Sequence, residues 1–232
     1  MSVLLALDSS TDKLAVALSG PAGLSCYEGA GGAQASERLL PEIQRLLAQQ
    51  GLALQELDAI AFGRGPGAFT GLRTACAVTQ GLAMGANKPV LALDSLMLVA
   101  EDARQQSPEW SGPLWVAMDA RMDEIYAAAY EFRDGQWQTL QAPALYAPAA
   151  LVQRWGTPGA VAGSALSVFA AHLGAPAKSW PQEASRARAL AALAQQAWTR
   201  GDLLDAAEAQ PLYVRDKVAF TTAERLAAGA KA

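Results

Sequence analysis

The sequence predicts an α/β protein made of two related halves. Two strand–turn–strand segments carry this prediction, because each begins with an apolar strand that ends in an aspartate and continues through a polar turn into a second apolar strand. The first turn begins at Asp8 and the second at Asp119, 111 residues further along a chain of 232 residues. A repeat at nearly half the chain length indicates duplication, and helical apolar periodicity between the hairpins supplies the α component.

The first half alternates strands and helices. In chain order we expect strands over residues 3–7, 14–18 and 24–28, a helix over 36–50, a strand over 57–62, a helix over 70–86, a strand over 90–93 and a helix from 94 to about 104. The apolar side chains of the 36–50 helix recur at helical spacing and form one stripe, which consists of Leu39, Leu40, Ile43, Leu46 and Leu47. Such a stripe covers either the chain's own sheet or a partner.

The second half repeats the hairpin and is less regular beyond it. We expect strands over 114–118, 125–130 and 160–162, helical structure near 167–172, a helix over 184–199, and a turn with a short strand over 208–215. The expected domain bounds are 1–104 for an N-terminal subdomain and 113–207 for a C-terminal subdomain. A C-terminal segment, about 208–232, is expected to pack back on the first subdomain.

The segment from Gly63 to Arg73 is the most distinctive part of the sequence. Three glycines, Gly63, Gly65 and Gly67, follow an apolar strand and precede a helix, an arrangement in which backbone N–H groups converge on an anion or on another backbone. The spacing fits neither a P-loop, which needs Lys-Ser/Thr after its last glycine, nor the Gly-x-Gly-x-x-Gly dinucleotide motif. Two interpretations stay open: an anion or partner loop, and a tight connection between strand and helix.

Two stripes of small residues run along the helix over 70–86: Gly71, Ala75 and Thr79, and Ala77, Gly81 and Gly85. An interior glycine costs up to about 1 kcal/mol of helix stability relative to alanine, a cost that close packing against another backbone offsets. That backbone belongs to the chain's own sheet in one interpretation, and to a second helix, internal or in another subunit, in the other. We expect a mixture, with one stripe facing each way.

Composition and charge disfavour several function classes. The formal net charge of −4 disfavours a stand-alone nucleic-acid binder. A single histidine, His172, and two cysteines argue against a zinc-hydrolase site, a disulfide framework and a Ser-His-Asp triad. Since no apolar run approaches the ~20 residues of a membrane span, and the N-terminus lacks an export signal, we expect a cytoplasmic protein that does not contact membranes.

Six segments together indicate a family resemblance. They follow one another in order over nearly the whole chain, and they are residues 4–11, 36–41, 63–73, 80–83, 119–126 and 212–216. The duplicated hairpin with its aspartate resembles the actin-like ATPase (ASKHA) superfamily, and the six segments resemble the bacterial TsaB (YeaZ) family of tRNA threonylcarbamoyladenosine biosynthesis proteins. The resemblance implies an actin-like fold of two related subdomains, each with a mixed sheet flanked by helices.

The resemblance also implies a function and its partners. A member of this family is the non-catalytic scaffold subunit of the N6-threonylcarbamoyladenosine modification complex. It pairs with and activates TsaD, the metal-binding threonylcarbamoyltransferase paralogue, it helps to form the docking site for the P-loop ATPase TsaE, and it forms a homodimer through the same face. It meets tRNA only through the complex. The His-x-x-x-His pair of the catalytic paralogue is replaced here by Asp-Ser-Leu-Met-Leu-Val over 94–99, so we expect no catalytic residue and no metal ligand.

The resemblance places two groups of site residues. The partner interface is expected at Leu39, Leu40, Ile43, Leu47, Arg64, Phe69, Gly71, Arg73, Ala77 and Gly81. A vestigial nucleotide loop is expected at Asp8, Ser9, Ser10, Thr11 and Asp119. The acidic Asp8 needs a metal to meet phosphate, and the second turn lacks the glycines that bring backbone amides to phosphate. We therefore expect no tightly bound cofactor, and weak ATP or ADP binding only in the complex.

Other function classes stay open at this point. One is an enzyme in its own right: a stand-alone actin-like ATP-dependent transferase or kinase, or a glycoprotease-like metallopeptidase, which the missing ligands strongly disfavour. Another is a purely homodimeric structural protein, which differs from the scaffold subunit only in its partner.

Overall fold

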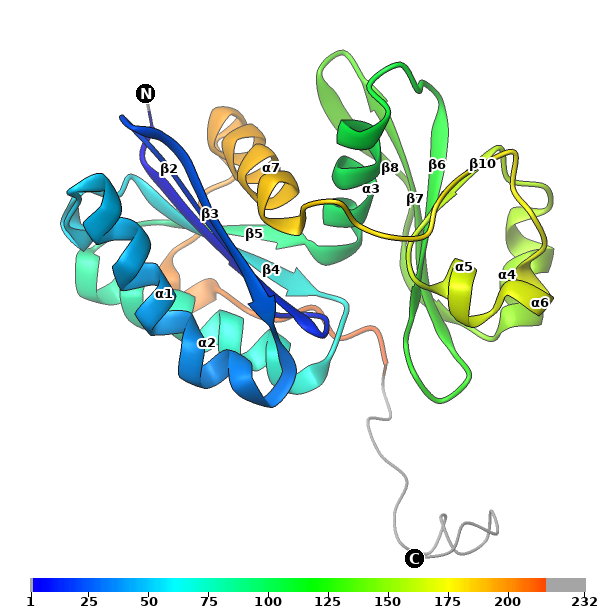
Figure 1. Ribbon diagram of the computed structural model, residues 1–232, viewed down its shortest axis with the longest axis horizontal. Helices are drawn as coiled ribbons and strands as arrows, with labels where there is room; N and C mark the ends of the chain where they lie inside the picture. The colour runs from blue at the N-terminus through cyan, green and yellow to red at the C-terminus, as the bar shows by residue number, and fades with distance from the viewer. Residues whose placement is uncertain (1, 216–232) are drawn as a thin grey trace, which may run out of the picture.

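Two five-stranded mixed sheets stand next to each other in the structure (Figure 1). The computed structural model describes residues 2–215. The first sheet contains β1 (Leu4–Asp8), β2 (Lys13–Gly20), β3 (Gly23–Ala30), β4 (Ala59–Gly65) and β5 (Val90–Asp94). The second sheet contains β6 (Pro113–Asp119), β7 (Ile125–Arg133), β8 (Gln136–Tyr146), β9 (Ala160–Ala162) and β10 (Lys178–Trp180).

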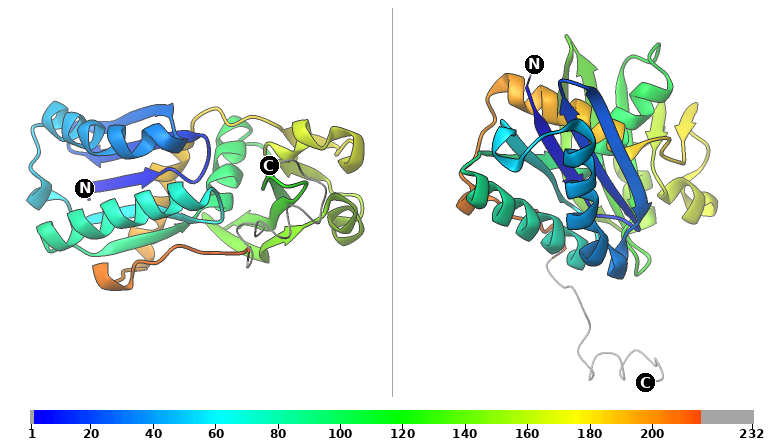
Figure 2. Two further views of the ribbon diagram at one scale, coloured as in Figure 1. Left: turned by 90° about the horizontal axis from the view of Figure 1, so that it is seen from below. Right: turned by 60° about the vertical axis from the view of Figure 1, so that its left-hand side comes forward.

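Helices flank both sheets. They are α1 (Ala35–Gln50), α2 (Phe69–Ala86), α3 (Ser95–Gln106), α4 (Pro148–Trp155), α5 (Ala165–Val168), α6 (Ala170–Leu173) and α7 (Arg186–Arg200). Short 3-10 turns occur at Gly32–Gln34, Leu54–Glu56 and Ala206–Glu208. The helices α1 and α2 lie side by side on one face of the first sheet, and α7 covers the opposite face (Figures 1 and 2). Within residues 2–215, no helix has both the length and the apolar character that crossing a bilayer requires.

The two sheets repeat one topology. The spatial order is β3-β2-β1-β4-β5 in the first sheet and β8-β7-β6-β9-β10 in the second. In each sheet the first three strands in sequence pair antiparallel, and the last two extend the sheet in parallel from its first strand. Asp8 ends β1 and Asp119 ends β6, so the two aspartates occupy equivalent places. The α/β class and the two related halves predicted from the sequence are confirmed.

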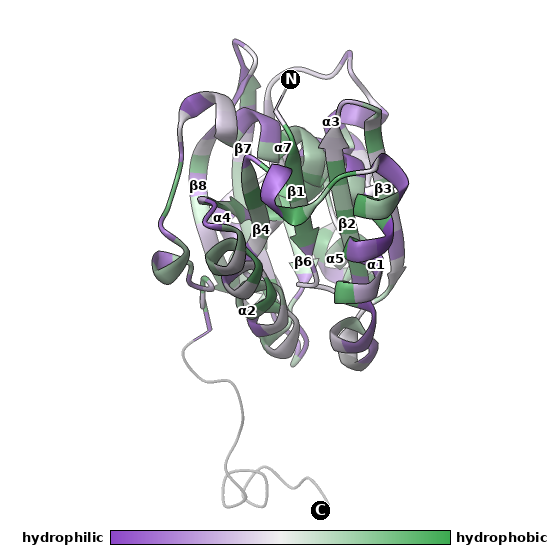
Figure 3. Cartoon of the chain, turned by 90° about the vertical axis from the view of Figure 1, so that its left-hand side faces the viewer, coloured by the Kyte–Doolittle hydropathy of each residue, from purple (hydrophilic) through white to green (hydrophobic). Residues whose placement is uncertain are grey.

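Alternating side chains divide the first sheet between two apolar cores. On β1, Leu5 and Leu7 pack toward α1 and α2, whereas Leu4 and Ala6 pack toward α7. Because helices cover both faces, these strands read as continuous apolar runs rather than as an alternation of apolar and polar residues. Figure 3 shows the central strands in green and much of α1 in purple.

The helix that ends each half covers the sheet of the other half. Helix α3 follows β5 of the first sheet, but its apolar side packs against β6 and β7 of the second. Helix α7 follows β10 of the second sheet, but its Ala187, Leu190 and Ala194 pack against Leu4 and Ala6 of the first. The expected subdomain bounds place α3 in 1–104 and α7 in 113–207, so each of these two helices packs on the sheet of the other expected subdomain. Helical periodicity shows that a helix has an apolar side, and it does not show which sheet that side meets.

Further segments differ from the predicted secondary structure, among them α4, which the sequence does not predict. Strand β8 is not foreseen, because polar side chains occupy most of its exposed positions, and β10 is only three residues long. Residues 209–215 are extended without being part of a sheet. The remainder of the expected C-terminal segment, from residue 216 onward, lies outside the described residues.

Candidate functional site

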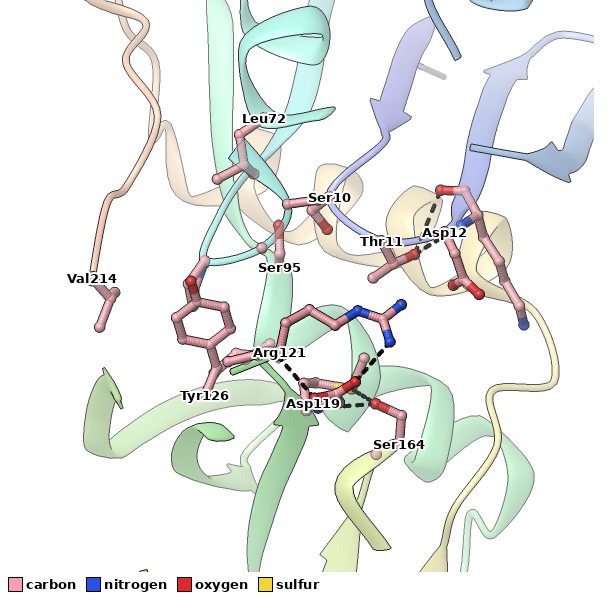
Figure 4. Close-up of a pocket in the computed structure, with 18 of the residues that line it drawn as sticks. Ser10, Thr11, Asp12, Leu72, Ser95, Asp119, Arg121, Tyr126, Ser164 and Val214 are labelled. Atoms are coloured by element: carbon pink, nitrogen blue, oxygen red, sulfur yellow. Dashed lines mark hydrogen bonds and ion pairs between the residues drawn. The ribbon is translucent and has the colours of Figure 1, made fainter. Parts of the chain in front are cut away.

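A cleft of about 930 Å³ lies between the two halves (Figure 4). The β1–β2 turn and the start of α2 line it from the first half, and the β6–β7 turn and residues 163–164 line it from the second. The extended segment Leu212–Arg215, which we call the C-terminal strap, forms a further part of the wall. Both of the turns that the sequence singles out therefore face one cleft.

Asp8 is fully buried and forms an ion pair with Arg186, the first residue of α7. The Nε of Arg186 donates to Asp8 Oδ1 at 2.8 Å. The backbone N–H and the hydroxyl of Ser10 donate to the same oxygen at 3.2 and 2.9 Å, and the hydroxyl of Ser95 donates to Oδ2 at 3.1 Å. Ser10, Ser95, Glu183 and Arg186, which we call the cleft floor, line the cleft, whereas Asp8 does not.

All three nitrogens of the Arg186 guanidinium donate to acceptors within the chain. Besides the bond to Asp8, Nη1 donates to both carboxylate oxygens of Glu183 at 2.9 Å. Nη2 donates to the hydroxyl of Ser10 at 2.9 Å and to the carbonyl of Ser95 at 3.3 Å. Burial lowers the pKa of Arg186, but the attraction of Asp8 and Glu183 outweighs burial and raises the pKa above its ordinary value. Arg186 therefore stays charged, and Asp8 has a permanent partner from within the chain.

The glycine-rich loop packs on the β1–β2 turn of the same chain. The N–H of Ala68 donates to the carbonyl of Ser10 at 2.7 Å, and the hydroxyl of Ser9 donates to the carbonyl of Gly71 at 2.8 Å. A Cβ at Gly71 would overlap the Ser9 carbonyl oxygen, and a Cβ at Gly67 would overlap that of Ser10, so only glycine permits this approach. The contacts support the tight-connection interpretation, with the neighbouring backbone as the group on which the loop converges.

The second turn is closed by its own aspartate. Asp119 Oδ1 accepts from the N–H of Arg121 at 2.8 Å, and Oδ2 lies 3.1 Å from the Arg121 guanidinium (Figure 4). The Asp119 N–H donates to the hydroxyl of Ser164 at 3.1 Å. Arg121, Met122 and Asp123 all have positive φ values, a conformation that costs about 1–2 kcal/mol for each non-glycine residue. The two aspartates of the expected nucleotide loop are therefore both committed to partners inside the chain.

Buried polar contacts join the two halves behind the cleft. Asp94 caps α3 by accepting from the N–H of Leu96 at 2.9 Å, and its other oxygen accepts from the hydroxyl of Tyr130 on β7 at 2.6 Å. Burial raises the pKa of Asp94, and the hydrogen bond from Tyr130 offsets part of that rise. Burial and the negative charge of Asp94 raise the pKa of Tyr130 well above its ordinary value. Glu101 on α3 accepts from the indole of Trp137 on β8 at 2.9 Å, which adds a second link.

The C-terminal strap binds to the start of α2. The N–H of Leu212 donates to the carbonyl of Arg64 at 2.7 Å. The ring of Tyr213 packs against Phe69 with the centroids 5.5 Å apart, and its hydroxyl accepts from Nε of Arg73 at 3.1 Å. The guanidinium of Arg73 lies 4.0 Å above the ring of Phe69. The strap therefore occupies part of the surface around Phe69 and Arg73, two of the expected interface residues.

The last described residue of the strap holds the second turn. Arg215 Nη2 donates to the carbonyls of Ala120 and Arg121 at 3.0 and 3.2 Å, and it pairs with Glu124 at 2.6 Å. Its guanidinium also lies 5.8 Å from the centre of the Tyr126 ring. The strap thus runs from α2 of the first half to the β6–β7 turn of the second.

Helix α2 buries one stripe of small residues and exposes the other, as expected. The buried stripe is Gly71, Ala75 and Thr79, and the exposed stripe is Ala77, Gly81 and Gly85. A Cβ added at Gly81 or Gly85 would meet no atom within 4 Å. Met84, with 66 % of its surface exposed, extends the same side of the helix. We call Arg73, Ala77, Gly81, Met84 and Gly85 the exposed α2 face.

Four of the residues expected at the partner interface are buried within the chain. Leu39, Ile43 and Leu47 pack between α1 and the first sheet, because the apolar stripe of α1 covers the chain's own core. Gly71 lies against Ser9. Leu40, 42 % exposed, is the stripe residue that remains at the surface. Of the other expected positions, Phe69 is half-buried and the rest are exposed: Arg64, Arg73, Ala77 and Gly81.

Sequence reasoning misses Arg186 and Tyr213, the residues that reach across the site. Arg186 bonds to Asp8 from 178 residues away, and Tyr213 bonds to Arg73 from 140 residues away. One signal was available for the first: an arginine in the first turn of a helix opposes the helix dipole and indicates an acidic partner. Among residues 2–215, no group of three or more His, Cys, Asp or Glu side chains is placed to hold a metal ion.

Comparison with protein families and curated relatives connects the chain to tRNA threonylcarbamoyladenosine. The family model described as TsaD, tRNA N6-adenosine threonylcarbamoyltransferase, matches residues 32–225. The tRNA threonylcarbamoyladenosine biosynthesis protein TsaB of Escherichia coli (strain K12) is 30 % identical over 94 % of this chain and 96 % of its own length. The protein of the same description from Haemophilus influenzae is 41 % identical over 53 % of this chain and 51 % of its own length.

Solved structures agree with these relatives. YeaZ from Pseudomonas aeruginosa superimposes with a TM-score of 0.82 at 35 % identity, over 92 % of this chain and all of that chain. A second Pseudomonas aeruginosa structure, described as similar to peptidase YEAZ, gives a TM-score of 0.84 at 36 % identity, over 93 % of this chain and all of that chain. The fold is the actin-like one expected from the sequence. With relatives that agree over nearly its full length, the chain belongs to the TsaB (YeaZ) family of tRNA threonylcarbamoyladenosine biosynthesis proteins.

Proposed function

We propose that this chain is the non-catalytic scaffold subunit of the tRNA threonylcarbamoyladenosine modification complex, and that it pairs with and activates TsaD. Membership of the TsaB (YeaZ) family supports a role of this chain in tRNA threonylcarbamoyladenosine biosynthesis. The observation that carries the scaffold role is the exposed α2 face, on which Gly81 stands uncovered in the interior of a helix of 18 residues and Gly85 stands uncovered in its last turn. Since each costs up to about 1 kcal/mol of helix stability, a second helix packed closely on them gives these glycines a role.

The same face suits a partner with two helices. Leu40 of α1 and Met84 of α2 are both exposed, and the two helices lie next to each other on one side of the first sheet (Figure 2). A related protein with the same helix pair would form a four-helix layer with them. Small residues allow the helix axes to approach toward the lower end of the ~8–10 Å range. A second copy of this chain offers an identical pair, so the homodimer and the complex with TsaD compete for one surface.

The state of Asp8 supports a non-catalytic role. Its carboxylate accepts hydrogen bonds from Arg186, Ser10 and Ser95, and the cleft floor separates it from any ligand in the cleft. A carboxylate held in this way is directed toward partners within the chain rather than toward the cleft. The transfer of the threonylcarbamoyl group is therefore assigned to TsaD.

TsaE and tRNA enter the proposal through the complex. Arg64 and Arg73 are exposed beside the start of α2, and they are the candidates of this chain for ion pairs with TsaD or with TsaE. The net charge of −4 does not favour direct binding of tRNA. The tRNA is accordingly expected to bind the assembled complex rather than this chain alone.

The test is a pair of matched glycine substitutions. Gly81→Leu places a large side chain on the exposed α2 face, and Gly159→Leu places the same side chain in the second half, also at a glycine whose added Cβ would meet no atom. We expect Gly81→Leu to weaken binding to TsaD at least tenfold, about 1.4 kcal/mol, in isothermal titration. Its free energy of unfolding should be unchanged or higher, because leucine favours a helix more than glycine does.

Gly159→Leu should bind TsaD like the unmodified chain. Equal affinity of all three proteins for TsaD would place the interface elsewhere. Reconstitution gives the second measurement: tRNA should be modified when this chain, TsaD and TsaE are combined with the threonylcarbamoyl donor. Modification by this chain alone would contradict the non-catalytic role.

A further inference from the structure

We propose that Arg73 is a preoriented receptor for a carboxylate of TsaD, and that the C-terminal strap belongs to the docking surface because its Tyr213 holds Arg73 in place. This inference rests on the proposed scaffold function and deepens it, since it names the chemistry that the partner presents to the exposed α2 face. Three observations carry it: the contacts that hold the guanidinium, the absence of a carboxylate partner for it among residues 2–215, and the charge of α2.

Two aromatic side chains hold the guanidinium of Arg73. Phe69, one turn earlier on α2, packs against it, with the ring centre 4.0 Å from the central carbon of the guanidinium. Nε of Arg73 donates to the hydroxyl of Tyr213 on the strap at 3.1 Å, and the ring of Tyr213 packs against Phe69. One face of the group and its Nε are thereby occupied. The two Nη atoms form the remaining edge, which matches the two oxygens of one carboxylate.

Arg73 is held in this way without being neutralised. Seven other arginines pair with a carboxylate of the same chain. Arg73 is exposed, and within residues 2–215 no carboxylate pairs with it. A long side chain that is already held loses less conformational freedom when it binds. An ordered and unpaired guanidinium is therefore prepared for an acidic group from outside the chain.

The charge of α2 specifies what the partner must supply. Arg73 is the only charged residue among the 18 residues of this helix. It lies on the exposed α2 face one turn before Ala77 and two turns before Gly81. A helix that packs closely on those small residues therefore passes next to Arg73. A carboxylate on that helix is complementary to Arg73, and a second positive charge there is repelled.

The same feature separates TsaD from a second copy of this chain. A symmetric dimer brings the same surface of both copies together. Two copies that pack through α2 bring two Arg73 guanidinium groups to the interface and no carboxylate from either helix. We therefore assign the carboxylate to TsaD, and we expect Arg73 to contribute more to the complex with TsaD than to the homodimer.

The experiment measures the affinity of full-length variants for TsaD by isothermal titration. Arg73→Gln removes the charge, and we expect it to weaken binding about tenfold at about 50 mM sodium chloride and less at about 500 mM, because salt screens an ion pair. Arg73→Lys keeps the charge without the planar fork and should give an intermediate loss. Arg188→Gln is the matched control, because Arg188 is an exposed arginine on α7, which covers the opposite face of the first sheet. It should bind TsaD like the unmodified chain.

Tyr213→Phe tests the part of the strap. It keeps the ring that packs against Phe69 and removes only the hydroxyl that accepts from Arg73. We expect about a threefold loss of affinity for TsaD in the otherwise unmodified chain, and no further loss when Tyr213→Phe is added to Arg73→Gln. A positioning residue acts through Arg73, so the two effects are not additive. The Tm of each variant should stay within about 3 °C of the unmodified chain, since both side chains are exposed.

Three results would overturn the proposal. The first is an Arg73→Gln protein that binds TsaD like the unmodified chain while Gly81→Leu binds weakly, a result that leaves the scaffold function standing. The second is an Arg73→Gln protein whose homodimer, measured by analytical ultracentrifugation, is weakened as much as its complex with TsaD. The third is an equal loss from Tyr213→Phe with and without Arg73→Gln. If neither Gly81→Leu nor Arg73→Gln weakens binding to TsaD, the proposed interface and this inference both fail.

Discussion

A buried carboxylate, Asp94, links the two halves behind the cleft. Asp94 caps α3 and also accepts from Tyr130 of the other half. Because burial raises the pKa of Asp94, the ionised carboxylate is less stable in the folded chain than in the unfolded one. The contribution of this group to stability therefore falls as the pH rises from its ordinary pKa through its folded pKa, and the hydrogen bond from Tyr130 limits the loss.

Replacing Tyr130 by Phe should expose this dependence. At pH 7.5 we expect a loss of about 1–3 kcal/mol in the free energy of unfolding, because a buried carboxylate loses a donor. The pKa of Asp94 then rises further, so the variant takes up a proton at a higher pH than the unmodified chain does. The loss should therefore be smaller at pH 5 than at pH 7.5 in urea unfolding. Tyr146→Phe, on the neighbouring strand β8, is the control, and a loss that grows toward pH 5 would contradict the assignment.

At the residue scale, the sequence identifies the position of Asp8 but not its ion pair with Arg186. Its place at the end of an apolar strand before a hydroxyl-rich turn is local information, and that placement is confirmed. The arginine that neutralises it is 178 residues away, and no local pattern links the two. The residues expected at the interface on α1 show a related limit. Leu39, Ile43 and Leu47 have the spacing of a stripe and pack on the chain's own sheet, and spacing alone does not distinguish that sheet from a partner.

Helix α2 is the element in which glycines serve two opposite surfaces. Gly71 allows the backbone of the β1–β2 turn to approach, whereas Gly85 stands on the exposed α2 face with open space around it. The same residue type therefore has opposite effects on stability within one helix. The sequence predicted this helix and its two stripes correctly, because both features follow from helical periodicity.

Alanine substitutions at Gly71 and Gly85 should change the free energy of unfolding in opposite directions. Gly71→Ala should lower the free energy of unfolding by about 1–3 kcal/mol, because the new methyl group overlaps the Ser9 carbonyl and forces the turn to move. Gly85→Ala should raise it by up to about 1 kcal/mol, the difference in helix propensity. Urea unfolding measures both, and a destabilised Gly85→Ala protein would mean that this glycine is not free in the isolated chain.

The remaining helices and strands could be predicted where local sequence patterns mark them, and not where they depend on contacts distant in sequence. The strands of the first sheet and the helices α1, α3 and α7 were predictable, because apolar periodicity and capping residues such as Asp94 mark them. Strand β8 carries mostly polar side chains at its exposed positions, so its pattern lacks the apolar run that identified the other strands. The crossing of α3 and α7 between the halves depends on contacts that no segment encodes by itself.

For the whole molecule, the cleft combines an open volume with a closed floor. About 930 Å³ is available between the halves, but the amide of Ala68 already bonds to Ser10, and all three nitrogens of the Arg186 guanidinium already have acceptors within the chain. These residues do not fit a nucleotide that binds through a metal and its phosphates. The size of the cleft is therefore a poor guide to its ligand.

Isothermal titration of the isolated chain with ATP and magnesium tests this. We expect no saturable binding at millimolar nucleotide, because the groups that would meet the phosphates have partners within the chain. A parallel titration in the presence of TsaD tests whether weak binding appears only in the complex. Micromolar affinity of the isolated chain for ATP would contradict the expectation.

Because α3 and α7 each cover the sheet of the other half, the core of each half is completed by a helix from the other. A fragment that stops near residue 110 would keep the first sheet but lose the helix that shields Leu4 and Ala6, and the complementary fragment would lack the α3 cover of its own sheet. We therefore expect that neither fragment folds by itself and that the chain unfolds in one cooperative step. The two repeats of similar topology therefore depend on each other for burial of their cores. A substitution at the α3 or α7 contacts in one repeat should affect the stability of both.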